Sequence, residues 1–224
     1  MKIAVTKLAE KSEGIPELFQ RFGHEAIIIP TMRAAPPTNP APLLHFAEMA
    51  SKGELDILIF TSALGVDIFF KKLIPKNVRI VSVGPKTADK VEEYGLRSEV
   101  IGKFSSGHFA EYLGDLRGKT VGIARAEVPN IELTASLRAK GARVIEAPVY
   151  SLVPGKSIAG TLKEVDAVIF TSAKSFEFSG FNSKMENIKV IAIGQKTANA
   201  MRKHGIEPDI VGNGTLENCL SLMS

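Results

Sequence analysis

The stretch ILIFTSA at Ile57–Ala63 returns as AVIFTSA at Ala167–Ala173, and this repeat decides how the fold is interpreted. Each copy passes from a short apolar run, rich in β-branched residues, directly into small hydroxylated residues. That order is typical of a buried strand that ends at a turn. The copies begin at residues 57 and 167, an offset of 110. A second copy at this distance indicates a duplicated structural unit.

Other parts of the chain repeat in the same way. The segment at Val78–Gly102, which contains VGPKTA, aligns without a gap with Ile188–Gly212, which contains IGQKTA, again at an offset of 110. Upstream, KIAVTK at Lys2 is similar to TVGIAR at Thr120, and Gly23 and Pro30 match Gly141 and Pro148, all at an offset of 118. Nearly the whole chain therefore consists of two copies of one unit.

Within each copy, short apolar strands alternate with helical patterns. We expect strands at Lys2–Thr6 and Ala26–Pro30 with a helix at Pro16–Phe22 between them, and further helices that end at Gly95 and Gly205. About ten strands follow from this pattern. The alternation predicts an α/β fold of two flavodoxin-like, doubly wound parallel-sheet lobes.

Two extended, proline-rich segments, at residues 27–42 and 144–155, predict that the chain crosses twice between the lobes through a two-stranded linker. The N-terminal part would then belong with the C-terminal part. The expected division is a lobe of residues 1–30 and 152–224, a lobe of residues 36–147, and linkers at 31–35 and 148–151. A single crossing, with sequential halves that meet near Leu116, is the alternative.

Composition narrows the class of protein. The 224 residues carry a net charge of +4, but the basic residues are scattered among acidic ones, and Trp is absent, which argues against a nucleic-acid partner. The lone Cys219 and the absence of a CxxC pair favour a reducing compartment. No apolar run approaches the roughly 20 residues of a membrane span. We expect a cytoplasmic monomer with no membrane association.

The repeated strand ends predict anion binding. In an open parallel sheet, ligands bind beyond the carboxyl ends of the strands, where the following helices present unpaired N–H groups. Ser62 and Ser172 lie at two such ends, and Thr87 and Thr197 follow the two Gly-x-Lys-Thr turns. The alternative is that all four hydroxyls only cap their own helices.

Motifs for common cofactors are absent from the sequence. It contains no GxxxxGK[ST] phosphate loop, no GxGxxG after a strand and no GxSxG. The four histidines lack metal-ligand spacing. We therefore expect neither a cofactor nor a metal.

These features together resemble one known family. The paired FTSA ends, the paired Gly-x-Lys-Thr-Ala turns, the opening IAVTK and the pair Val149-Tyr150 are similar to uroporphyrinogen-III synthases, from Lys2 to about Leu222. The resemblance implies two flavodoxin-like lobes and packing of the N-terminal segment on the C-terminal lobe. It also implies an activity: cyclisation of the linear tetrapyrrole hydroxymethylbilane, a polycarboxylate, with inversion of its last ring and loss of water, without a cofactor.

The resemblance also implies site residues. Tyr150 matches the family's linker tyrosine and would be the catalytic group, because a phenol is protonated at neutral pH and can donate to the departing hydroxyl. Lys7 occupies a position at which the family commonly has arginine. The residues expected to bind substrate are Thr6, Lys7, Ser62, Ala63, Thr87, Ser105, Ser106, Arg125, Ser172, Ala173, Lys174 and Thr197.

Two other functions stay open on sequence alone. A non-catalytic, two-lobed sensor or binding module for a small polyanion would use the same architecture, because a fold does not fix a function. A nucleotide-binding enzyme is the third possibility, although it lacks the expected phosphate loops. Stabilisation of the protein by polycarboxylates but not by nucleotides would exclude the nucleotide-binding enzyme and leave the synthase and the polyanion-binding module.

Overall fold

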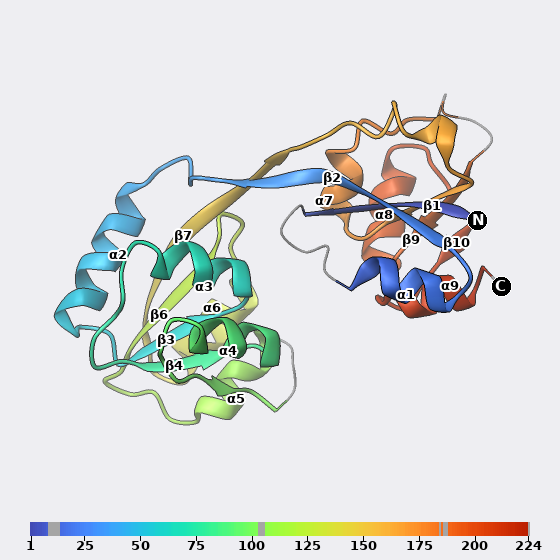
Figure 1. Ribbon diagram of the computed structural model, residues 1–224. Coiled ribbons are helices and arrows are strands. Elements are labelled where there is room, and N and C mark those ends of the chain that lie inside the picture. The colour runs from blue at the N-terminus through green and yellow to red at the C-terminus, as the bar shows by residue number, and fades with distance from the viewer. Residues whose placement is uncertain (9–13, 103–105, 184, 186–187, 224) are drawn as a thin grey trace. The chain divides into compact units, whose positions relative to one another are not determined.

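The computed structural model describes residues 1–8, 14–102, 106–183, 185 and 188–223 (Figure 1). It divides into two compact units. Unit 1 comprises Met1–Ala34 and Val153–Ser224, and unit 2 comprises Ala35–Leu152. The chain passes from one unit to the other twice, near the end of strand β2 (Glu25–Ala35) and near the end of strand β7 (Arg143–Pro154).

Unit 1 contains a parallel sheet whose strand order is β10-β9-β8-β1-β2. Besides β2, its strands are β1 (Lys2–Leu8), β8 (Ala167–Phe170), β9 (Lys189–Ala192) and β10 (Ile210–Val211). Its helices are α1 (Ile15–Arg21), α7 (Ala173–Glu177), α8 (Gln195–Lys203) and α9 (Leu216–Ser221), with a 3-10 turn η3 at Leu162–Glu164.

Alternating residues of the strands in unit 1 face two separate cores. Ile3 and Val5 of β1 pack with α1 and α9, whereas Ala4 between them packs on the side of α7 and α8. Figure 1 shows these two pairs of helices on opposite faces of the strands. Because both faces are covered, the strands have continuous apolar runs, such as residues 3–5 of β1 and Ala167–Phe170 of β8, instead of strict alternation with polar residues.

Unit 2 contains a parallel sheet in the order β7-β6-β3-β4-β5. Its other strands are β3 (Ile57–Phe60), β4 (Arg79–Ser82), β5 (Glu99–Val100) and β6 (Thr120–Ala126). Its helices are α2 (Ala41–Lys52), α3 (Ala63–Phe70), α4 (Pro85–Glu92), α5 (Phe109–Leu113) and α6 (Ile131–Ala139), with a 3-10 turn η2 at Ser106–His108.

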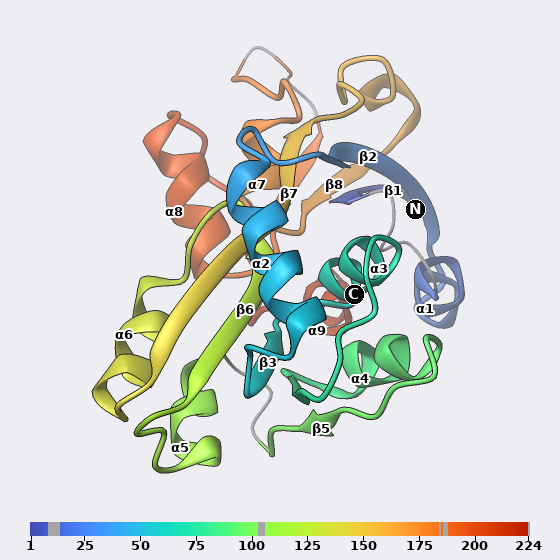
Figure 2. The same cartoon turned by 90° about the vertical axis from the view of Figure 1, so that its left-hand side faces the viewer.

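The sheet of unit 2 is also covered on both faces. Side chains of α5 and α6 pack against one face in a core that includes Ile59 and Ile123. On the other face Phe60 of β3 packs against Phe69 and Phe70 of α3, and Phe69 meets Phe46 of α2 edge to face at 5.5 Å. Figure 2 shows α5 and α6 on the opposite side of the strands from α2 and α3.

The two sheets have the same spatial order, although the chain enters them at different points. The strand pairs β1/β6, β2/β7, β8/β3, β9/β4 and β10/β5 occupy corresponding positions. Unit 1 begins with the first two of these positions, whereas unit 2 ends with them. This rotation of the chain order explains why the sequence repeats with two offsets, 118 for β1 and β2 and 110 for the other strands.

Strands β1 and β2 extend beyond the ranges predicted from the sequence. β1 continues to Leu8 and β2 runs from Glu25 to Ala35, because Pro30 lies at a shift of register and does not end its strand. Thr6 pairs with Ile29, but Leu8 pairs with Met32. Proline lacks the N–H for a regular ladder and is tolerated at such irregularities.

Candidate functional site

In each sheet the strand order reverses between two adjacent strands, so that the loops after their carboxyl ends lead to opposite sides. In unit 1 these strands are β1 and β8, and in unit 2 they are β6 and β3. Ligands of open α/β sheets bind beyond such a point, because the loops on either side lead away from each other. The predicted residues Thr6 and Ser172 lie at the point in unit 1, and Ser62 and Arg125 lie at the point in unit 2.

In unit 2 the structure brings Ser62 and Tyr150 together. The Ser62 Oγ accepts a hydrogen bond from the Gly65 N–H at 3.1 Å and so caps α3. The same oxygen lies 3.4 Å from the Tyr150 Oη, and either hydroxyl can be the donor. Because an O–H···O bond is usually about 2.7–2.8 Å long, this contact is weak. The phenol is thus held near the cap but its proton is only loosely engaged.

Tyr150 differs from the two other tyrosines. The hydroxyl of Tyr94 donates to Asp67 Oδ1 at 2.8 Å, and that of Tyr112 donates to Glu99 Oε2 at 2.9 Å. Burial, and then the bond to Asp67, raise the pKa of Tyr94 to about 12. Tyr150 is only 6% exposed and, within the described residues, its hydroxyl contacts Ser62 alone. It is the tyrosine whose proton is not already committed to a carboxylate.

The guanidinium of Arg125 is bound within its own unit. Its Nε donates to Glu146 Oε1 at 3.0 Å, and its Nη1 donates to the carbonyl oxygens of Ala126 at 2.8 Å and Glu127 at 2.6 Å. The side chains of Arg125 and Glu146 are 15% and 21% exposed. Glu146 also accepts from the hydroxyl of Thr134 at 2.9 Å. The guanidinium thus has three acceptors within the protein, and the substrate contact expected from the resemblance stays a prediction.

In unit 1 the predicted Thr6 and Ser172 are joined through Ser175. Thr6 is fully buried, and its hydroxyl donates to Ser175 Oγ at 3.0 Å and to Ile169 O at 3.2 Å. Ser172 and Ser175 form a reciprocal capping box, in which each Oγ accepts from the backbone N–H of the other at 3.0 Å. The buried Thr6 hydroxyl is therefore hydrogen-bonded to the first turn of α7 through Ser175.

Thr87 and Thr197 occupy matching places in the first turns of α4 and α8. Both are almost completely buried, 5% and 3% exposed. The N-cap residues of these helices are Gly84 and Gly194, which have no side chain that could cap the first turn. Among the described residues neither threonine hydroxyl makes a hydrogen bond. Ser62 and Ser172 therefore do cap their own helices, whereas neither threonine makes a capping bond within the described part of the chain.

The remaining predicted residues are less sharply placed. Lys7 is half-buried in β1. Ala63 and Ala173 are the first residues of α3 and α7, and both are half-exposed. Lys174 points to its own helix, with its Nζ 3.7 Å from Glu177 Oε2 and 5.1 Å from the centre of the Phe178 ring.

Two predicted serines precede α5. Ser105 lies outside the described residues, and Ser106 opens η2, although the structure does not describe its side chain.

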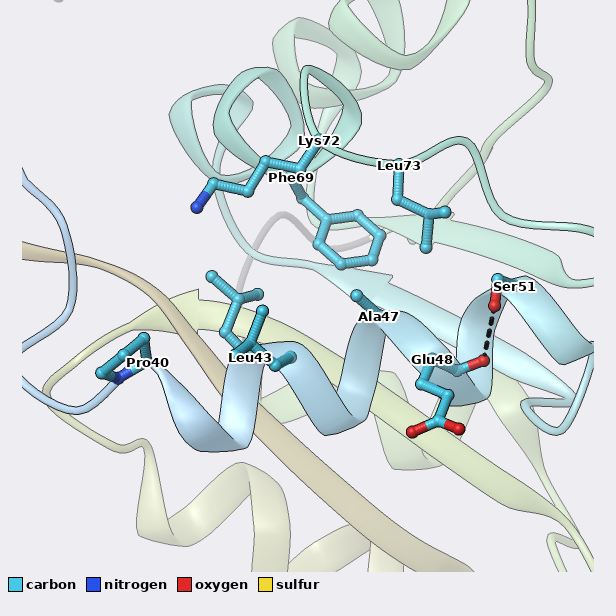
Figure 3. A pocket seen from close by; sticks show the side chains of 9 residues that line it. Pro40, Leu43, Ala47, Glu48, Ser51, Phe69, Lys72 and Leu73 are labelled. Atoms are coloured by element: carbon cyan, nitrogen blue, oxygen red, sulfur yellow. Dashed lines mark hydrogen bonds between the residues drawn. The ribbon is translucent and has the colours of Figure 1, made fainter.

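A pocket of about 420 Å³ lies elsewhere in unit 2, between α2 and the end of α3 (Figure 3). Leu43, Ala47, Phe69 and Leu73 give it an apolar lining. On the α2 side of this pocket the Ser51 hydroxyl donates to the Glu48 carbonyl at 2.7 Å, the bond drawn as a dashed line in Figure 3. None of its lining residues is a predicted site residue.

Across the described ranges, no group of three or more His, Cys, Asp or Glu side chains is arranged to hold a metal ion. In the same part of the chain, no helix is both long and apolar enough to cross a membrane.

Sequence reasoning missed Ser175, Glu146 and the shifts of register. Ser175 stands three residues after Ser172, which is the spacing of a capping box. The paired Pro30 and Pro148 mark the two shifts, in which Arg125 pairs with Pro148 but Ala126 pairs with Tyr150. No sequence signal distinguishes Glu146 from other strand carboxylates.

Comparison with known proteins gives one consistent family. The family model described as uroporphyrinogen-III synthase HemD matches residues 13–178 and 155–223. A Ruminiclostridium josui porphyrin biosynthesis protein HemD is 26% identical over 98% of this chain, and the chain spans about half of that relative's length, 47%. A Methanothermobacter thermautotrophicus relative, provisionally named uroporphyrinogen-III synthase, is 28% identical over 91% of this chain and 90% of its own.

A solved structure has a similar fold. The uroporphyrinogen-III synthetase of Helicobacter pylori superposes with a TM-score of 0.65 and 21% identity, and the match covers 99% of this chain and 97% of that one. Nearly the whole chain therefore shares the α/β fold of that structure.

Proposed function

Because this chain belongs to the uroporphyrinogen-III synthase family, we propose that it cyclises hydroxymethylbilane to uroporphyrinogen III in tetrapyrrole biosynthesis. The reaction inverts the terminal pyrrole ring and releases water. The observation that carries the proposal at the site is the Tyr150 phenol, which is nearly buried and bonded weakly to Ser62. The product differs from the substrate only by the loss of water, with no net oxidation or reduction, so the enzyme is a lyase that needs no redox cofactor.

Tyr150 acts as the general acid. The terminal carbon–oxygen bond of hydroxymethylbilane breaks while the phenol donates its proton, so the hydroxyl leaves as water. Ring closure then releases a proton from a pyrrole carbon, which restores the phenol and balances the reaction. Ser62 orients the phenolic oxygen in both states, because a hydroxyl can accept from the phenol or donate to the phenolate.

The strand ends hold the carboxylates of the substrate. Thr87 and Thr197 support this role because each has a hydroxyl that makes no hydrogen bond to the described residues and lies in the first turn of a helix, where backbone N–H groups also favour an anion. The N–H groups of Ala63 and Ala173 stand at the starts of the two repeated helices. Donors of this kind share negative charge without a buried lysine. Lys7 and Lys174 supply positive charge nearby in sequence.

The organisation proposed with this function is two flavodoxin-like lobes, residues 1–30 with 152–224 and residues 36–147, joined by a two-stranded linker. Their common strand order supports it, because the order β2-β1-β8-β9-β10 follows the flavodoxin-like pattern and unit 2 repeats it with a rotated chain order. A cytoplasmic monomer that binds no nucleic acid completes the proposal, in keeping with the scattered basic residues and the single Cys219.

Replacement of Tyr150 by Phe tests the catalytic assignment. The variant keeps the ring and removes the proton donor, so we expect kcat for enzymatic product formation to fall about a hundredfold, the lower range for general acid catalysis. Tyr112→Phe removes an exposed hydroxyl and is the matched control. Unchanged turnover in Tyr150→Phe would remove the phenol from the mechanism. Binding of hydroxymethylbilane without turnover by the wild-type protein would favour the non-catalytic polyanion binder.

A further inference from the structure

A shift of register places two consecutive residues of β7 against α3. Up to Arg125 and Pro148 the strands β6 and β7 pair residue for residue, but Ala126 pairs with Tyr150, so that Val149 is an extra residue. The Tyr150 Oη lies 3.4 Å from Ser62 Oγ, and the Val149 Cγ2 lies 3.8 Å from the place where a Cβ of Gly65 would be. Regular alternation would send neighbouring side chains to opposite faces.

The shift therefore decides where the Tyr150 phenol lies. Without the extra residue, Ala126 would pair with Val149, and regular alternation would send the side chains of Val149 and Tyr150 to opposite faces of the sheet. Irregularities of this kind occur next to active sites, where they aim a side chain differently. Whatever holds the shift in place also holds the phenol at the start of α3.

Arg125 spans this shift. On one side its Nε is bonded to Glu146, which belongs to the regular part of β7. On the other side its Nη1 is bonded to the carbonyls of Ala126 and Glu127, beyond the shift. The N–H of Glu127 in turn donates to the Tyr150 carbonyl at 2.8 Å. One planar guanidinium thus connects the strand before the shift to the backbone that pairs with Tyr150.

The loop beyond Arg125 is fastened at a second place. The Glu127 carboxylate accepts from the N–H of Thr38 at 3.3 Å and from its hydroxyl at 3.2 Å. The Ser151 hydroxyl donates to the Pro36 carbonyl at 3.0 Å. Ser151, which follows Tyr150, and Glu127, which bonds to the Tyr150 carbonyl, are therefore both tied to the segment that leads into α2. Arg125 fixes the end of β6, next to Glu127.

We propose that Arg125 and Glu146 are positioning residues for Tyr150, which hold the register shift that aims its phenol at Ser62. This assignment rests on the catalytic role proposed for Tyr150, and it replaces the direct contact between Arg125 and substrate that the sequence predicts. Glu146 distinguishes the two roles, because a carboxylate does not attract a polycarboxylate substrate and has no reason to aid binding.

Two variants separate positioning from substrate contact. Glu146→Gln keeps the side-chain volume and an acceptor oxygen, and Arg125→Lys keeps the positive charge but cannot form the planar set of three bonds. If Arg125 positions Tyr150, both variants lower kcat by about tenfold and leave KM nearly unchanged. They also raise the share of the type I isomer of uroporphyrinogen, which forms spontaneously. If Arg125 binds substrate, Glu146→Gln leaves kcat intact and lowers KM, while Arg125→Lys raises KM.

A spectroscopic measurement tests the positioning without substrate. The chain has three tyrosines, so 3-fluorotyrosine labelling gives a simple ¹⁹F spectrum, in which Tyr150→Phe identifies one signal. We expect Glu146→Gln and Arg125→Lys to move or broaden the Tyr150 signal and leave that of Tyr112 in place. Glu99→Gln is the matched control, because it removes the negative charge from the exposed pair with Arg79 and from the acceptor of the Tyr112 hydroxyl, and should move only the Tyr112 signal.

The two readouts distinguish failure of this inference from failure of the proposed function. An unmoved Tyr150 signal in both variants overturns the positioning role, whatever the activity. If the variants move the Tyr150 signal but the wild-type protein forms no uroporphyrinogen III, the positioning of Tyr150 is upheld and the synthase assignment is refuted. Urea unfolding of each variant confirms that the spectra come from folded protein, and Glu146→Gln is the milder change.

Discussion

Replacement of Ser175 by Ala should destabilise unit 1 more than its small size suggests. Ser175 is fully buried, and its Oγ accepts from Thr6 and from the Ser172 N–H, both at 3.0 Å, and donates to the Ser172 carbonyl at 2.8 Å. Thr6 keeps a second acceptor, Ile169 O, after the change. The Ser172 N–H loses its side-chain acceptor.

The magnitude follows from these bonds. One net hydrogen bond contributes about 1 kcal/mol, and an unsatisfied buried N–H costs about 1–3 kcal/mol. We therefore expect Ser175→Ala to lower the free energy of unfolding by about 2–4 kcal/mol. Ser51→Ala is the control, because its hydroxyl bonds to the Glu48 carbonyl on an exposed helix face, and it should cost less than about 0.5 kcal/mol.

The assay is urea unfolding followed by circular dichroism, since the chain lacks tryptophan. A double-mutant cycle with Thr6→Val isolates the bond between the two hydroxyls, and we expect a coupling of about 1 kcal/mol. Two results together would refute the view that the Thr6 and Ser175 hydroxyls stabilise the start of α7 jointly. Ser175→Ala would lower the free energy of unfolding no more than Ser51→Ala, and the effects of Ser175→Ala and Thr6→Val would be additive.

Three other predictions concern single residues. Gly122→Ala should cost about 1–3 kcal/mol by overpacking, because its Cβ would lie 2.8 Å from Phe46 Cζ; Gly160→Ala, with open space around it, should be neutral in the same unfolding assay. Burial, followed by the bond to Asp67, raises the pKa of Tyr94 to about 12. The stability that this group contributes should therefore be complete below about pH 10 and be lost towards pH 12; Tyr94→Phe should remove the latest phase of a tyrosine absorbance titration. Burial raises the pKa of Cys219 to about 11, so a disulfide reagent at pH 8 should label it only after unfolding, and rapid labelling of folded protein would contradict its place on the buried face of α9.

Much of the secondary structure was predictable because both sheets are covered on two faces. Each buried strand then reads as an apolar run, and the return of ILIFTSA as AVIFTSA identified β3 and β8 as equivalent. Gly95 and Gly205 have φ values of +75° and +74°, the left-handed conformation expected after a helix. The two repeat offsets were visible in the sequence, but the strand order that explains them depends on pairings between distant segments.

The site was predictable at the level of strand ends, and less so at the level of bonds. Ser62 and Tyr150 are 88 residues apart, and the repeat alone gives no reason for their hydroxyls to meet. Arg125 illustrates the limit most clearly. The family resemblance suggested that it binds substrate, but it gave no sign of the acceptors that hold the guanidinium, which depend on the neighbouring carboxylate of Glu146 and on a shift of register. Glu146 leaves no pattern in one sequence, and the shift leaves only the paired prolines Pro30 and Pro148.

The most direct test of the central claim supplies the purified protein with freshly made hydroxymethylbilane, without added cofactor, and separates the oxidised products by isomer. If the protein is a uroporphyrinogen-III synthase that uses Tyr150, wild-type protein gives mainly the type III isomer, and Tyr150→Phe shifts the product towards type I. Only type I product from wild-type protein that is demonstrably folded would contradict the account.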